Sequence, residues 1–99
     1  MNQGLLILLA PPNLDETMVD LFLEQTALSG FTSSNVSAHG NSNSNLSLLE
    51  QVTGRQQKTQ FMVYADFVEL QRLIDILKTK FANKDLRYIL ISTTESQLI

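Results

Sequence analysis

Three segments of the chain are apolar at nearly every position: residues 5–9, 61–64 and 88–91. A strand with one face in water alternates apolar and polar residues, whereas a strand buried on both faces does not. We therefore predict three strands with two apolar faces. Residues 31–39 do alternate, with Val36 on one side and Phe31 on the other, which predicts a fourth strand near a sheet edge.

Two longer segments have apolar residues three and four positions apart, which is the spacing of one helix face. The first face comprises Leu14, Met18, Leu21, Phe22 and Leu28, and the second comprises Leu70, Leu73, Ile74, Leu77 and Phe81. Asn13 with Glu16, and Asp66 with Glu69, have the spacing of helix-capping boxes. Gly30 is expected to end the first helix in a left-handed conformation.

The chain order of these elements is β-α-β-β-α-β. It predicts an α+β, ferredoxin-like fold in which a four-stranded antiparallel sheet carries two helices on one face. A length of 99 residues fits a single domain over residues 1–99. The helices cover only one face of the sheet, so a lone chain would leave a second apolar face in water. We predict that further copies of the chain cover this face, in a homo-oligomer.

Residues 40–55 form a long connection between two strands that a tight hairpin could join. The first half is polar and low in complexity, which predicts a mobile loop. In the second half, Leu46, Leu49 and Val52 are spaced three residues apart, so we predict a short helical segment. Its apolar edge either contacts a partner protein or packs on its own or a neighbouring subunit. Arg55 is the last residue of this connection, and its side chain either binds an anionic ligand or is solvated.

Composition excludes several classes of function. The net charge of −3 argues against nucleic acid as the main partner. The absence of cysteine excludes disulfides and thiolate chemistry within the chain. Residues 1–4 lack a basic leader and the apolar run ends at Ala10, too early for a membrane span. We expect a cytoplasmic protein that does not insert into a membrane.

His39 is the single histidine and lies at the end of the second strand. It is either an ordinary edge residue or, repeated by symmetry, a ligand for zinc, copper or nickel, with Glu50 or Asn35 as oxygen co-ligands. No serine, histidine and acid occur at a diagnostic spacing and no glycine-rich phosphate loop is present, so we do not predict an enzyme. The alternative is a small ferredoxin-like oligomeric enzyme, of oxygenase or isomerase type, with His39 in a pocket.

The motifs Gly30-Phe31-Thr32 and Val36-x-x-x-Gly40, within this order of elements, resemble the PII signal-transduction superfamily. The stretches 37–40 and 47–55 are most similar to a PII-like family of unknown function whose genes lie near heavy-metal efflux pumps. The resemblance implies a regulatory homotrimer whose sheets face its centre. It also implies ligand sites in clefts between subunits, and a long T-loop that contacts a partner, for which a metal-efflux component is the candidate.

The resemblance also assigns ligand-binding positions. Thr32 matches the threonine that contacts adenine in PII proteins, and Arg87 falls where they place a phosphate-binding lysine. Gly40 matches their loop-base glycine. Asn41-Ser42 replaces the Arg-Gln pair that follows that glycine, and the C-terminal arginines are missing. Phosphate recognition needs convergent amides and cations. We therefore do not expect ATP to bind as it does in those proteins, and the sequence leaves the identity of any cofactor open.

Overall fold

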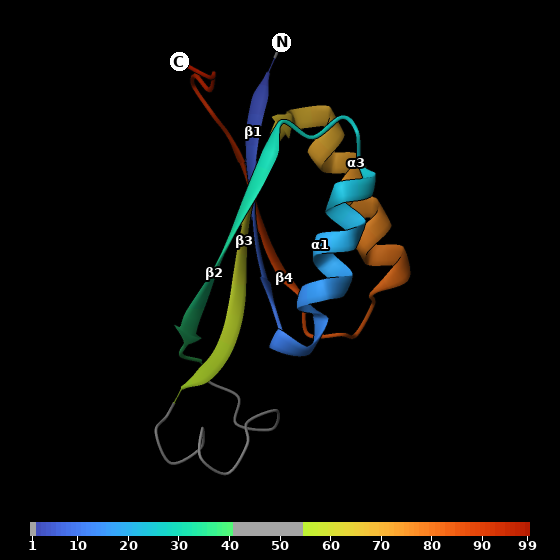
Figure 1. The fold of residues 1–99 in the computed structure, drawn as a ribbon, viewed down its shortest axis with the longest axis vertical. Coiled ribbons are helices and arrows are strands. Elements are labelled where there is room, and N and C mark those ends of the chain that lie inside the picture. Colours follow the sequence, from blue (N-terminus) through green and yellow to red (C-terminus); the bar gives the residue numbers. More distant parts are fainter. Residues whose placement is uncertain (1, 41–54) are drawn as a thin grey trace.

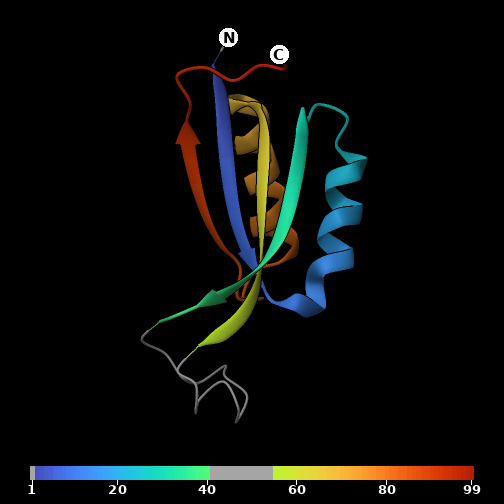
Figure 2. The ribbon, with the colours of Figure 1, turned by 60° about the vertical axis from the view of Figure 1, so that its left-hand side comes forward.

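The computed structural model describes residues 2–40 and 55–99. The elements are β1 (Gln3–Ala10), the 3-10 turn η1 (Pro12–Leu14), α1 (Asp15–Glu24), β2 (Gly30–Ala38), β3 (Gln56–Asp66), α3 (Phe67–Lys80) and β4 (Arg87–Ser92). The strands form one antiparallel sheet in the order β2-β3-β1-β4. Both helices lie on the same side of this sheet (Figure 1), and Figure 2 shows the order of the strands across it. The predicted fold class is confirmed.

The core lies between the sheet and the two helices. Its buried side chains are Leu6, Leu8, Ala10, Met18, Leu21, Phe22, Phe61, Val63, Ala65, Leu70, Leu73, Ile74 and Leu77. Phe22 stands at its centre, because its ring meets the rings of Phe31 and Phe61 edge to face, each at 5.3 Å between centroids. The predicted helix faces therefore do form the core. Leu28 and Phe81 pack against it from just beyond the helix ends.

The predicted boundaries of the first helix, a cap at Asn13 and an end at Gly30, are wrong. No side chain caps α1 at its start, because Pro11 leads into a 3-10 turn in which the N–H of Leu14 donates to the carbonyl of Pro11. The helix ends at Glu24, and Gly30 is the first residue of β2 instead of a left-handed cap. Leu28 therefore packs against the core from the connection to β2 and not from the helix.

Asp66 stands at the predicted N-cap position of the second helix, but the predicted capping box does not form. Asp66 is the last residue of β3 and stands opposite Gln3 of β1, so its carboxylate accepts a hydrogen bond from the Gln3 side chain. A backbone group satisfies the helix start instead, since the N–H of Phe67 donates to the carbonyl of Asn2 at 2.8 Å. Glu69 pairs with Arg72 rather than reaching back. No helix among the described residues is long and apolar enough to cross a membrane.

Candidate functional site

The outer face of the sheet, on the side without helices, is the main candidate surface. The strand registers align its residues in three rows across all four strands. In the order β4, β1, β3 and β2, these rows are Ile91, Leu5, Tyr64 and Gly30; Ile89, Ile7, Met62 and Thr32; and Arg87, Leu9, Gln60 and Ser34. Two rows are thus apolar over three strands and become small or polar only at β2.

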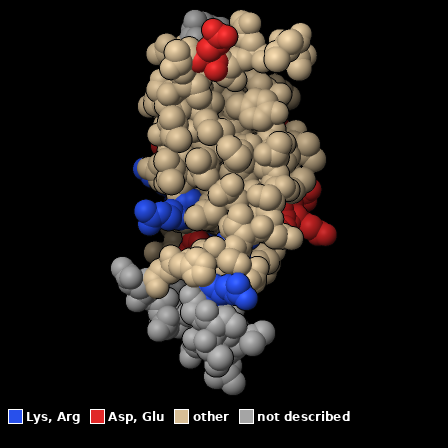
Figure 3. Space-filling model, turned by 90° about the vertical axis from the view of Figure 1, so that its left-hand side faces the viewer, with Lys and Arg blue, Asp and Glu red and all other residues tan. Residues whose placement is uncertain are grey.

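This face is exposed in the single chain. Ile89, Ile91 and Tyr64 are 45%, 41% and 38% exposed. Leu5, Ile7, Leu9 and Met62 are partly buried by their neighbours alone. Figure 3 shows a wide central area of this face without lysine, arginine, aspartate or glutamate, with charged side chains only toward its margins. A contiguous apolar surface of this kind is typical of a protein interface.

Thr32 and Arg87 lie on opposite edges of the outer face. Thr32 is on the edge strand β2 and Arg87 begins the other edge strand, β4. Three strand spacings separate them across the sheet, which is about 14 Å, and they also lie in different rows. One chain therefore does not bring these two predicted ligand residues together. A small ligand that touches both would have to lie between the β2 edge of one copy and the β4 edge of another.

Gly40 and Arg55 flank the base of the long loop. The pairing of β2 with β3 ends at Ala38 and Gln56, so Gly40 lies two residues after the last pair and Arg55 directly before it. Both are exposed. The predicted partner-contacting residues Leu46, Leu49 and Val52 lie outside the described residues. So does Glu50, the predicted metal co-ligand.

An ion pair beside the loop base was not predicted from the sequence. Lys58 stands opposite Val36 near the start of β3, and its ammonium pairs with the carboxylate of Asp85 in the turn before β4. The Lys58 side chain is only 8% exposed. The sequence offers little signal for this pair because the two residues are far apart in the chain and Lys58 has polar neighbours on both sides. The pair ties the turn before β4 to the strand that leads out of the long loop.

The described residues supply no ready metal site. No group of three histidine, cysteine or acidic side chains comes together within residues 2–40 and 55–99. His39 is exposed just after β2, and Asn35 is exposed within it. A site built on His39 would thus need ligands from the rest of the chain or from other copies.

Comparison with protein families gives one match over the whole chain. The family described as "Protein of unknown function (DUF3240)" matches residues 1–99. No curated protein matches the sequence.

Solved structures share the fold at low sequence identity. A DUF3240 family protein from Shewanella baltica superposes with a TM-score of 0.80 at 18% identity, covering 100% of this chain and 98% of that one. CPII, a nitrogen regulatory PII-like protein from Thiomonas intermedia bound to ADP, AMP and bicarbonate, gives a TM-score of 0.72 at 12% identity, covering 100% and 98%. The periplasmic divalent cation tolerance protein CutA from Archaeoglobus fulgidus gives 0.72 at 9% identity, covering 96% and 87%. The predicted PII-like fold is confirmed by these likenesses.

Proposed function

The chain belongs to the DUF3240 family of proteins of unknown function, and from this premise we propose that it is a PII-like regulatory protein that works as a homotrimer. It binds a small ligand in the clefts between subunits and contacts another protein through residues 40–55. The observation that carries the proposal is the apolar outer face of the sheet, whose central area has no charged side chain and which no element of the described chain covers.

The assembly is supported by the energetics of this face. Fully burying a large aliphatic side chain contributes about 1.5 to 3 kcal/mol relative to leaving it in water. Ile89 and Ile91 are each close to half exposed, and they adjoin partly buried Ile7 and Leu5. Contact between copies through this face would recover that burial. Three copies are proposed because of the resemblance to PII proteins.

The ligand site is supported by the separation of Thr32 and Arg87 on opposite edges of the sheet. Assembly brings edges of different copies together, so the two residues would face one cleft, with Arg55 and Gly40 at its loop side. The cationic residues favour a small anion. The presence of ADP, AMP and bicarbonate in CPII makes these three compounds the first probes.

The protein is proposed to lie in the cytoplasm, and its partner is proposed to be a component of a metal-efflux system. Leu46, Leu49 and Val52 would provide its apolar contacts. His39 and Glu50 would bind a divalent metal in the assembled protein. The divalent cation tolerance protein among the structural neighbours supports a link to metals.

A pair of matched variants tests the assembly and the clefts together. Ile89→Asp places a charge on the outer face, whereas Val68→Asp places one on α3, where Val68 is 55% exposed. Size-exclusion chromatography with light scattering should give three times the chain mass of 11.1 kDa for the wild type and for Val68→Asp, and the mass of one chain for Ile89→Asp. The thermal shift with ADP should disappear together with the trimer, because binding stabilises only the species that has the site.

A wild-type monomer at micromolar concentration would overturn the proposal. A stable dimer would instead favour the small oligomeric enzyme with His39 in a pocket. A trimer that gives no thermal shift with ADP, AMP or bicarbonate would retain the assembly and reject these anions as ligands.

A further inference from the structure

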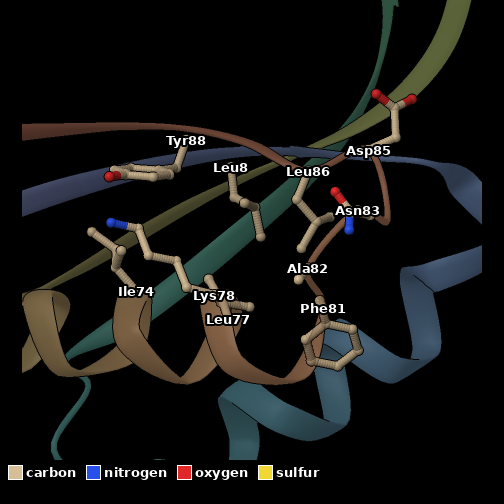
Figure 4. A pocket seen from close by; sticks show the side chains of 10 residues that line it. All are labelled: Leu8, Ile74, Leu77, Lys78, Phe81, Ala82, Asn83, Asp85, Leu86 and Tyr88. Atoms are coloured by element: carbon tan, nitrogen blue, oxygen red, sulfur yellow. The ribbon is translucent and has the colours of Figure 1, made fainter.

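A separate hollow of about 410 Å³ lies on the helix side of the sheet, between α3 and β4. Its apolar lining includes Leu8, Ile74, Leu77 and Leu86. Figure 4 shows the α3 side chains on one side of it and those of Leu8, Leu86 and Tyr88 on the other. It is therefore distinct from the outer face, because its lining lies on the opposite side of the sheet.

The hollow follows from how the helices cover the sheet. α3 packs mainly on the two central strands, β1 and β3, whereas β4 is an edge strand that pairs only with β1. The turn between α3 and β4 contains two residues with left-handed backbone, Asn83 and Asp85, both with φ of 62°. The hollow lies beside this turn, between the end of α3 and the start of β4, and the side chains that line it do not fill it.

One positive charge stands at this hollow. The Nζ atom of Lys78 lies 5.5 Å from the centroid of the Tyr88 ring. No carboxylate within the described ranges pairs with Lys78, because the two ion pairs there are Lys58 with Asp85 and Arg72 with Glu69. Asp85 also lines the hollow, but its carboxylate points away from it in Figure 4 and is held by Lys58. The site thus combines apolar walls with one cation that lacks an ionic partner.

From this arrangement we infer that the hollow between α3 and β4 binds a small amphipathic carboxylate. Its apolar body would lie against Leu77 and Leu86, and its carboxylate would pair with Lys78. A volume of about 410 Å³ falls within the usual range for small-ligand sites, and such sites combine apolar walls with few, well-placed polar groups. A neutral apolar molecule would leave the cation unpaired, and an amine would be repelled by it.

Three probes with the same chain length separate these ligand classes: octanoate, 1-octanol and octylammonium. In protein labelled at the isoleucine methyl groups, octanoate should shift the NMR signal of Ile74, which lines the hollow. The signals of Ile7, Ile89 and Ile91 on the outer face should stay in place, as should that of Ile76 on another side of α3. Octanoate should bind about tenfold more tightly than either of the other probes.

Two lysines of α3 give the matched variants. Lys78→Met keeps most of the side-chain length but removes the charge, and should weaken octanoate about tenfold while leaving 1-octanol unchanged. Lys80→Met removes a charge from the same helix at a residue that does not line the hollow, and should change neither affinity. Both residues are exposed, so both variants should fold. Equal affinity for octanoate and octanol, shifts confined to the outer-face methyl groups, or no effect of Lys78→Met would each overturn the inference.

Discussion

Along β1, Leu6 and Leu8 point toward the helices and are at most 1% exposed, whereas Leu5, Ile7 and Leu9 point the other way and remain partly exposed. The two sets are chemically almost identical. What differs is the covering, because the inner face has two helices and the outer face has none within the described chain. The apolar residues on both faces therefore indicate that both faces are buried in the working protein. Only the fold shows which of the two faces the chain covers with its own helices.

The largest expected difference between the faces comes from two adjacent leucines. Leu6→Ala removes a fully buried side chain from the core, and should lower the free energy of unfolding by about 3 kcal/mol. Leu5→Ala removes the same atoms from a partly exposed position, and should cost about 1 kcal/mol in a single chain. Urea unfolding at several protein concentrations measures both values.

The dependence on concentration separates the two faces further. The cost of Leu5→Ala should rise with protein concentration if the outer face is an interface, because assembly then contributes to stability. The cost of Leu6→Ala should stay nearly constant. Equal costs for both variants at every concentration would show that the two faces do not differ in the way that the structure indicates.

The fold was predictable because its signals are local. The apolar runs at residues 5–9, 61–64 and 88–91 lie within β1, β3 and β4, and the periodic segments gave the buried faces of both helices. The caps were not predictable, because the side chain of Asp66 turns to Gln3, a contact that depends on the register of β1 with β3. Capping motifs read from sequence cannot take account of such a distant competitor.

The candidate sites also differ in how far the sequence predicts them. The outer apolar face follows from the pattern of the strands, and the structure adds only its rows and its exposure. The separation of Thr32 from Arg87 follows from the order of the strands in the sheet. That order could be predicted only after the fold had been recognised. The contact of Lys58 with Asp85 and that of Lys78 with Tyr88 depend on the course of one turn before β4, for which no periodic pattern exists.

Two strand glycines extend the comparison of the faces to backbone packing. A Cβ atom on Gly4, on the inner face, would stand 3.0 Å from Leu70 Cδ1 and 3.2 Å from the carbonyl oxygen of Ile91. Gly4→Ala should therefore destabilise the fold by about 2 kcal/mol, because the buried Leu70 side chain and a backbone atom must both give way. The drop in melting temperature by calorimetry gives the measurement.

Gly30 on the outer face is the matched control. A Cβ atom there would stand 2.8 Å from the Tyr64 hydroxyl oxygen, closer than any contact at Gly4. Tyr64 is 38% exposed, so its ring can turn away, and Gly30→Ala should cost less than about 1 kcal/mol. A larger loss for Gly30→Ala than for Gly4→Ala would mean that Tyr64 is held in place, as contact with another copy would hold it.

The smallest expected difference in stability is between variants that break the two ion pairs. Asp85→Asn keeps a residue that tolerates the left-handed backbone but leaves the ammonium of Lys58 with no charged partner, in a side chain that is 8% exposed. Losing one partner of a buried pair is costly, yet Asp85 is itself 47% exposed, so we expect a loss of about 1 kcal/mol after screening by solvent. Glu69→Gln breaks the exposed pair with Arg72 and should cost about 0.3 kcal/mol. Chemical unfolding at low and high salt measures both losses. If Asp85→Asn costs no more than Glu69→Gln, water reaches Lys58 freely, and the turn before β4 is not tied to the base of the long loop.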